Sequence, residues 1–303
     1  MLMTKRMRSN LLLLLTAFIW GTAFVAQKKG VDTLSPNTFN GIRQILGCLA
    51  LLPVIAFREK KEKLHPEKTV QSDKKSLMAG GIVCGICLCA ASTTQTAGLV
   101  YTDAGKGGFI TAMYIVIVPI IGFFTGKKIR PSLIVAVAVA TCGLYLLCMG
   151  GGTVSGGLNR GDMLLILCAV LFSVHILVVD RVSPHVDGVK LSFIQFFVSG
   201  MINIVFMLLF DKPDFAQIFS CAVPLLYAGV MSCGVAYTLQ IVAQKDTDPT
   251  VASILMSMES LFALLAGLAF GEKMSVSGFI GCALMMTAII LAQLPEKKSG
   301  DKI

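Results

Sequence analysis

The sequence predicts an all-α integral membrane protein with ten transmembrane helices, arranged as two inverted five-helix repeats. Three observations predict this fold class. The 303 residues are 55% hydrophobic and 14% charged, with a mean hydropathy of +0.79, which is more apolar surface than a soluble fold can bury. The charges gather between apolar runs that are long enough to cross a bilayer. Two mostly apolar stretches also share one residue pattern, about 145 residues apart.

Ten apolar segments come close to the length of about 20 residues that a transmembrane helix needs. They are 11–27, 38–57, 77–99, 107–125, 132–149, 162–180, 190–210, 219–242, 251–270 and 275–294. Lys5, Arg6 and Arg8 precede the first segment, as in a signal peptide. That segment is longer than the apolar core of about 7–15 residues in a cleaved signal, and no clear cleavage site precedes Lys28. A retained first helix is therefore expected.

The connections between the segments are polar and mostly short. Arg58–Ser76 carries seven Lys and Arg residues and is expected to be a solvated loop. The glycine-rich stretch 150–161 is expected to be a flexible linker between two halves. Residues 126–131 and 271–274 suit tight helical hairpins, because Gly ends a helix and Pro starts the next one.

The repeat keeps its register without any gap. The matched positions are Gln95 and Gln240, Thr102-Asp103 and Thr247-Asp248, Met113 and Met258, Gly122 and Gly267, Gly126 and Gly271, and Lys128 and Lys273. The repeats are assigned to residues 1–150, with helices one to five, and 151–303, with helices six to ten. Because five is odd, the second repeat crosses the membrane in the opposite sense. Such repeats place a binding site near the midplane, between the halves.

The distribution of Lys and Arg predicts the orientation. With the N-terminus inside, the inner segments carry 19 of the 26 Lys and Arg residues and the outer segments carry six, while Arg43 lies within a span. Both termini are therefore expected to be cytoplasmic. The same rule accounts for the net charge of +9, so binding of nucleic acid is not expected.

No metal or cofactor motif is visible. The ten cysteines lie almost all in apolar segments, and Cys84, Cys87 and Cys89 have no matching CxxC or His pair elsewhere. They are expected to pack helices, without a disulfide framework. The linker lacks the GxxxxGK[ST] pattern of a phosphate loop, so no cofactor is expected.

Three ionisable residues within spans are candidates for chemistry, because burying such groups in a membrane is costly. Glu259 lies about 13 Å from the inner end of its span, close to the midplane. Loss of water favours a neutral carboxyl, so Glu259 is a candidate proton carrier; the alternative is a structural hydrogen bond. Arg43 is a candidate for holding an anionic group, or else extends to the interface. His175 is a candidate proton relay, or else a neutral histidine bonded between helices.

Neutral polar residues complete the candidate cavity. They are Gln27, Asn40, Gln44, Thr94, Gln95, Thr111, Tyr114, Gln195, Asn203, Tyr237, Gln240 and Ser257. Most are expected to form hydrogen bonds between helices, and a minority to touch a substrate. Trp20, the only tryptophan, lies in the middle of a span, where helix packing is the first interpretation and a cavity wall the second.

Several motifs resemble those of one family across nearly the whole chain. They are Ile19-Trp20-Gly21, Arg43, Tyr101-Thr102-Asp103-Ala104-Gly105-Lys106, Val118-Pro119, Met258-Glu259-Ser260, Gly271-Glu272-Lys273 and Gly278. The chain resembles the EamA-like members of the drug/metabolite transporter superfamily. Two positions depart from the family pattern: Lys127 replaces a Glu after Gly126, and Ser260 replaces a Pro. The departures weaken any role for the loop glutamate and leave the expected fold intact.

The resemblance implies a secondary carrier in the cytoplasmic membrane of a bacterium, which moves small metabolites, often outwards. The first hypothesis is alternating-access transport, coupled to protons through Glu259, of a compound such as an amino acid. The second is an exchanger of two metabolites without protons. The third is a membrane-embedded enzyme or a structural subunit, which the absence of a catalytic group set disfavours. The expected partners are membrane lipids, a small-molecule substrate and protons, in a monomer or a homodimer.

Overall fold

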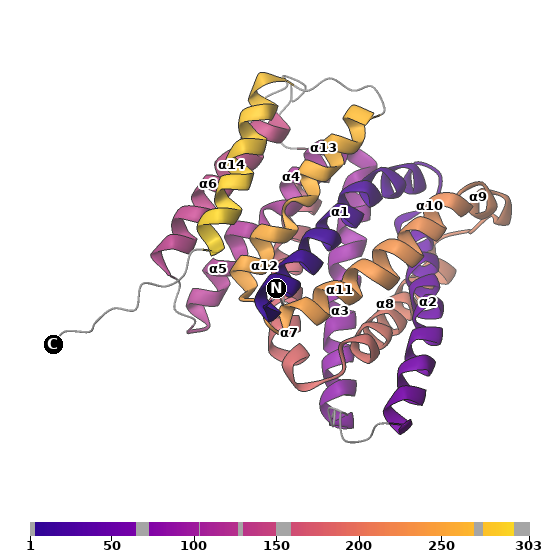
Figure 1. The fold of residues 1–303 in the computed structure, drawn as a ribbon. Helices are drawn as coiled ribbons and strands as arrows, with labels where there is room; N and C mark the ends of the chain where they lie inside the picture. Colours follow the sequence, from indigo (N-terminus) through magenta and orange to yellow (C-terminus); the bar gives the residue numbers. More distant parts are fainter. Residues whose placement is uncertain are drawn as a thin grey trace.

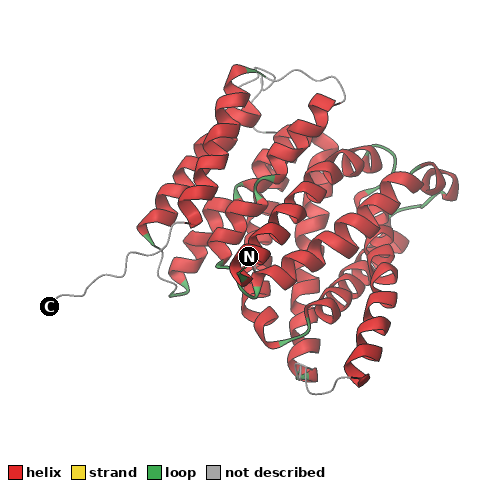
Figure 2. Ribbon diagram, viewed as in Figure 1, coloured by secondary structure: helices red, strands yellow, loops and turns green. Residues whose placement is uncertain are grey.

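The computed structural model describes residues 4–64, 73–102, 104–126, 130–149, 159–269 and 275–293. Within these segments the chain is helical, with turns and short loops between the helices and no strand (Figure 2). Such a fold pairs the backbone N–H and C=O groups inside each helix, as a membrane core requires.

The first half of the chain forms six helices (Figure 1). They are α1 (Lys5–Val31), α2 (Pro36–Leu64), α3 (Lys74–Tyr101), α4 (Ala104–Ala112), α5 (Tyr114–Phe124) and α6 (Pro131–Met149). The second half is divided more finely. It contains α7 (Arg160–Val182), η2 (Ser183–His185), α8 (Gly188–Phe210), α9 (Phe215–Ser220), α10 (Ala222–Leu226), the π-helix η3 (Tyr227–Tyr237), α11 (Thr238–Gln244), α12 (Pro249–Met256), α13 (Glu259–Ala269) and α14 (Val276–Gln293).

The helices coincide with the predicted spans. Seven described helical segments are long and apolar enough to cross a membrane. Three shorter apolar segments, Pro131–Leu146, Pro249–Ala263 and Val276–Ala292, fall on the remaining predicted spans. The exposed side chains include many large apolar ones, such as Phe124 and Phe210, as expected for a surface that contacts lipid.

The helix ends follow the local sequence. Gly126 has a φ of 86°, the left-handed conformation that ends α5, and Pro131 begins α6. Asn159 and Asp162 form a capping box at the start of α7, and Asp187 caps α8. The predicted hairpin at 271–274 lies outside the described residues, as does most of the predicted linker, 150–158.

The predicted loop over Arg58–Ser76 is shorter than expected. Helix α2 continues to Leu64 and α3 begins at Lys74, while 65–72 lie outside the described residues. The extension of α2 is rich in Glu and Lys, which favour helix although they end the apolar span. Apolar length therefore predicted the span, but not the full helix.

Two spans that were expected to be continuous are broken. The span at 107–125 is interrupted at Met113, between α4 and α5, and the span at 251–270 at Ser257 and Met258, between α12 and α13. At both breaks the backbone bonds shorten to three residues, since Met113 N donates to Ile110 O and Met258 N donates to Leu255 O. The two breaks lie at matched positions of the sequence repeat.

Contacts between helices occur in matching pairs. Helix α3 packs on α7, and the segment formed by η3 and α11 packs on α1. Helices α4 and α5 pack on α7, while α12 and α13 pack on α1. Finally, α2 packs on α8, and α6 lies beside α14 at the edge of the bundle (Figure 1). Exchanging the two halves of the chain therefore leaves the packing pattern almost unchanged.

Candidate functional site

A cavity of about 450 Å³, counted with the open space at its mouth, lies between helices of both halves. Nine of the described helices contribute its walls: α1, α2, α3, α4, α5, α7, η3, α11 and α13. The lining residues are Trp20, Phe24, Gln27, Arg43, Gln95, Thr111, Tyr114, Phe172, Ile176, Ser232, Tyr237, Gln240 and Glu259. The mixture of aromatic walls with a few polar groups is typical of a ligand site.

The residues that line the cavity reach to about one helical turn from each end of the helices. We call the end where α1 begins the N-terminal face, and the other end the opposite face. Gln27 lies about 6 Å of helix from the opposite face, Gln95 about 9 Å and Arg43 about 10 Å, at 1.5 Å per residue. Of the lining residues, Gln240 lies nearest the N-terminal face, four residues before the end of α11.

Glu259 is the only described acidic residue in the cavity wall. It is the first residue of α13, directly after the helix break, and its side chain is buried. Tyr114, the first residue of α5, donates a hydrogen bond from its hydroxyl to Oε1 of Glu259 at 3.1 Å. The helix N-terminus stabilises negative charge there, and the carboxyl keeps a second oxygen for another partner.

Arg43 is the basic residue of the cavity wall, and it is also buried. Its Nε donates to Oδ1 of Asn40 at 2.8 Å, and its guanidinium lies 5.5 Å from the centre of the Phe39 ring. Asn40 in turn donates to Thr96 Oγ1 at 2.8 Å and to the Ser92 carbonyl at 3.2 Å, both on α3. Asn40 therefore lies behind the cavity wall and orients Arg43 from there.

The two charged residues have no ion-pair partner among the described residues. Four polar atoms of the cavity walls also lack a hydrogen bond within the described structure: Trp20 Nε1, Gln27 Oε1, Thr111 Oγ1 and Gln240 Oε1. Buried polar groups usually have partners, so a cluster of them around a cavity points to a ligand or water.

His175 does not line the cavity. It lies behind the aromatic wall, with its ring 6.2 Å from that of Tyr237 and 6.5 Å from that of Phe172. Its Nε2 shares a hydrogen bond with Gln195 Oε1 at 3.1 Å. This is the interhelical arrangement that was considered as the alternative to a proton relay.

Of the sixteen residues named from the sequence, nine line the cavity, and His175 and Asn40 lie behind it. The nine are Trp20, Gln27, Arg43, Gln95, Thr111, Tyr114, Tyr237, Gln240 and Glu259. Several of the other neutral polar residues bond between or within helices. Gln44 bonds Ser92, Ser199 and Asn203, and Thr94 bonds the carbonyls of its own helix. Trp20, for which packing was the first interpretation, lies in the cavity wall, where its ring contacts that of Tyr237 at 4.6 Å.

Sequence reasoning missed the apolar part of the wall: Phe24, Phe172 and Ile176, together with Ser232. A partial signal existed, because Phe24 follows Trp20 by one helical turn and Ile176 follows Phe172 by one turn. In helices that are apolar on all sides, that spacing does not distinguish a cavity wall from a lipid face.

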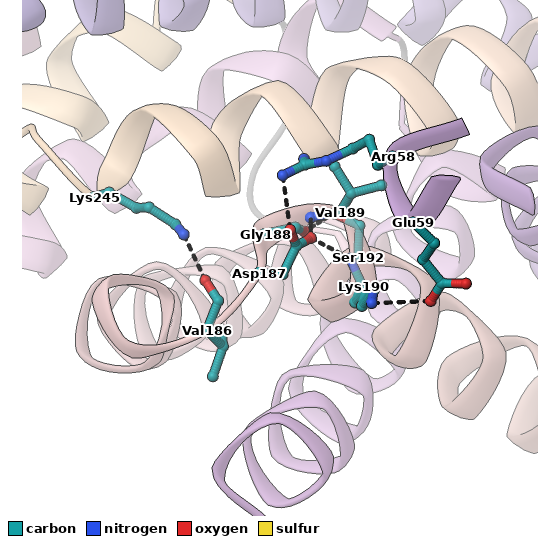
Figure 3. Close-up of polar contacts among 9 residues, drawn as sticks. All are labelled: Arg58, Glu59, Val186, Asp187, Gly188, Val189, Lys190, Ser192 and Lys245. Carbon is teal, nitrogen blue, oxygen red and sulfur yellow. Dashed lines mark hydrogen bonds and ion pairs between the residues drawn. The ribbon is translucent and has the colours of Figure 1, made fainter. Parts of the chain in front are cut away.

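Hydrogen bonds connect the helices between the cavity and the N-terminal face. Gln240 Nε2 donates to Gln244 Oε1 at 3.0 Å, and Gln244 Nε2 donates to the Ile176 carbonyl at 3.2 Å. Lys245, the residue after Gln244, donates a hydrogen bond from its Nζ to the Val186 carbonyl (Figure 3). These bonds connect α11 to α7 and to the segment that precedes α8.

Helices α2 and α8 are tied together at both ends. At the N-terminal face Arg58 pairs with Asp187 at 2.8 Å and Lys190 pairs with Glu59 at 2.9 Å (Figure 3). At the opposite face Asp211, which caps the end of α8, accepts hydrogen bonds from the backbone and hydroxyl of Thr38 at 3.2 and 2.9 Å. Helices α2 and α8 therefore form one rigid pair.

Lys245 reaches that pair from α11. Burial lowers the pKa of Lys245, while Asp187 nearby opposes that shift. Its ammonium gives up part of its hydration for one carbonyl and a nearby carboxylate.

Comparison with known proteins gives a consistent result. The model of the EamA-like transporter family matches residues 7–149 and 159–294. An uncharacterized transporter of Archaeoglobus fulgidus is 30% identical over 96% of this chain and 87% of its own length. The uncharacterized transporter YoaV of Bacillus subtilis is 21% identical over 90% of this chain and 92% of its own length.

The fold also matches a solved protein. A crystal structure, titled only as that of a protein, aligns with a TM-score of 0.74. The alignment covers 94% of this chain and 96% of that one, at 17% identity. At this identity the likeness establishes a shared fold only.

Proposed function

This chain belongs to the EamA-like transporter family, and from that premise we propose that it is a secondary active transporter that moves a small metabolite by alternating access. One observation carries the proposal. A cavity between the halves holds a carboxyl and a guanidinium that have no ion-pair partner among the described residues, at the level of a helix break. Discontinuous helices near the midplane are where many secondary carriers bind their substrates.

Ten spans in two inverted repeats account for the packing pattern. The matched helix contacts support a pseudo-two-fold axis in the membrane plane. Gln95 and Gln240, equivalent in the repeat, both line the cavity. Tyr114 and Glu259 are also equivalent, and they bond each other across the halves. Two equivalent positions can touch only near the axis, so this bond marks the centre of the carrier.

The substrate is proposed to be a small zwitterion, such as an amino acid or a similar compound. Arg43 offers two free guanidinium nitrogens to a carboxylate, and Glu259 offers its second oxygen to an amine. The unpaired atoms of Trp20, Gln27 and Gln240 supply further polar contacts. The aromatic walls exclude water around the apolar part of the ligand.

Glu259 is proposed to carry the coupling proton. A carboxyl that binds the substrate amine in one state and a proton in another links substrate transport to proton transport. The hydrogen bond from Tyr114 holds the Glu259 carboxyl in place. The alternative is an exchanger of two metabolites, in which Glu259 contacts substrate only. Uptake by such an exchanger would need a counter-substrate inside the vesicle and would not depend on the pH gradient.

We further propose that the N-terminal face is cytoplasmic, in the inner membrane of a bacterium. The excess of Lys and Arg in the segments on that face supports this orientation. The hydrogen bonds of Lys245 and Gln244 at the N-terminal face favour a state whose cavity opens toward the outside.

The test is transport into proteoliposomes with an imposed pH gradient, using a panel of radiolabelled L-amino acids. We expect Glu259→Gln to abolish or uncouple proton-driven flux while the protein still inserts and remains monodisperse. Proton-driven flux that is unchanged in the variant would refute the coupling role. Flux that requires internal substrate and does not respond to pH would select the exchanger.

A further inference from the structure

Both charged residues of the cavity have a glycine of a neighbouring helix pressed against their backbone. Gly21 on α1 lies against the carbonyl of Glu259, and Gly229 in η3 lies against the carbonyl of Arg43. We propose that Gly21 and Gly229 are positioning residues, and that each sets the place of one charged side chain in the cavity. The proposal rests on the transport function proposed above.

The contact at Gly21 leaves no room for a side chain. A Cβ added there would lie 2.5 Å from the Glu259 carbonyl oxygen, 2.7 Å from Phe262 Cβ and 2.8 Å from Ala263 N. Two of these are backbone atoms, which cannot rotate away. Only a glycine lets the two backbones come this close, so any larger residue must push α13 away from α1.

The break before α13 makes this contact important for Glu259. A continuous helix would hold Glu259 in place from both sides, whereas here it begins a new helix after Ser257 and Met258. Its position then depends on what α13 packs against. Around Glu259 that neighbour is α1, where the rings of Phe18 and Phe262 also meet at 5.4 Å. A shift of α13 would change the 3.1 Å bond from Tyr114.

Gly229 has the same relation to Arg43. A Cβ at Gly229 would lie 2.9 Å from the Arg43 carbonyl oxygen and 2.6 Å from Leu46 Cβ. Gly47 continues this contact along α2, since its own Cβ would meet Cys233 Cβ at 2.7 Å. The partner segment is a π-helix, a form that is rare and often found at functional sites. The contact sets the depth at which Arg43 enters the cavity.

The only tryptophan provides a readout that needs no known substrate. Trp20 precedes Gly21 and lines the same cavity as Glu259. The titratable or charged groups around Glu259 are Tyr114 on α5, Tyr237 on η3, Cys168 on α7 and Arg43 on α2. A pH titration of Trp20 fluorescence that disappears in Glu259→Gln therefore reports on Glu259.

The experiment compares Gly21→Ala and Gly229→Ala in the purified, full-length carrier. We expect Gly21→Ala to move the fluorescence midpoint by about one pH unit, a tenfold change in proton affinity. We expect Gly229→Ala to leave that midpoint in place and to weaken the quenching of Trp20 by acetate and glycine about tenfold, as a displaced anion site would.

Two glycines serve as matched controls. Gly85 is packed as tightly, since its Cβ would lie 2.7 Å from Val198 Cβ and 2.9 Å from the Gln195 carbonyl, but it contacts neither charged residue. Gly85→Ala should lower thermal stability without changing the midpoint or the quenching. Gly108 has only Ser260 Oγ within reach, at 3.7 Å, so Gly108→Ala should change little.

If Gly21→Ala does not insert, Phe262→Leu replaces it, because that variant loosens the packing of α13 on α1 at the Phe18 ring without adding atoms. A midpoint that stays at the wild-type value in the variant that inserts would overturn the assignment of Gly21. Quenching by acetate and glycine that is unchanged in Gly229→Ala would overturn that of Gly229. A fluorescence titration that persists in Glu259→Gln would instead refute the role of Glu259, and with it the proposed coupling.

Discussion

Replacing Asn40 with Ala is expected to weaken substrate binding although Asn40 does not line the cavity. The side chain links Arg43 to α3, through a bond of 2.8 Å to the guanidinium and one of 2.8 Å to Thr96. A hydrogen bond to a charged group contributes about 1.5–3 kcal/mol, so its loss releases Arg43 from its orientation. If most of that energy appears in binding, KM for a carboxylate substrate rises between tenfold and a hundredfold.

The assay is initial uptake into proteoliposomes over a range of substrate concentrations, so that KM and kcat are obtained separately. We expect KM to rise and kcat to change by less than about threefold, since Glu259 and the helix breaks are untouched. Unfolding of the purified protein, followed in parallel, should show a loss of about 1–3 kcal/mol from the unsatisfied groups.

Gln44→Ala is the matched control. Gln44 lies one turn further along α2 than Asn40 and is equally buried. Its side chain bonds Ser92, Ser199 and Asn203, and it forms no hydrogen bond with the Arg43 side chain in the described structure. It should lose similar stability and keep the wild-type KM. A wild-type KM in Asn40→Ala, or an equal rise in both variants, would refute the reasoning.

Three further outcomes are expected. Tyr114→Phe should insert normally and reduce proton-driven transport about tenfold, since it removes the bond to the Glu259 carboxyl; wild-type flux in reconstituted vesicles would contradict this. Asp187→Asn keeps a cap for α8 and should cost about 0.5–1 kcal/mol in chemical unfolding, through the lost pair with Arg58, whereas Asp187→Ala should cost about 1 kcal/mol more. Because burial lowers the pKa of Lys245, the unfolded chain binds more protons just below pH 10.5, so stability should rise with pH there. That rise in melting temperature should be absent in Lys245→Met.

Much of the fold was predictable, because the bilayer imposes one dominant rule. Apolar runs of sufficient length must be helices, so hydropathy located the helices of the described spans. The helix breaks were not predictable. Met113 and Met258 are ordinary helix formers, and no proline or glycine marks either position. The breaks depend on tertiary packing, which a local pattern does not contain.

The charged part of the site was predictable for a related reason. Burial of Glu259 and Arg43 is so costly that their position in apolar spans is informative by itself. The roles of neutral residues were harder to predict. Trp20 was first interpreted as packing and lies in the cavity wall, while Asn40 acts from behind that wall. Both outcomes depend on which way a side chain faces, and nearly uniform hydrophobicity around these helices hides that direction.

The bond between Tyr114 and Glu259 has a consequence for the membrane potential. In the inverted arrangement proposed above, a group on the axis between the two halves stays at the same depth while the halves exchange conformations. Moving a unit charge across the full potential takes about 2.3 kcal/mol per 100 mV, and a charge that does not change depth performs almost none of this work. The charge of Glu259 would then make the rate of the conformational step depend very little on the membrane potential. Any electrogenic signal would arise where the substrate and the proton travel between the axis and either surface.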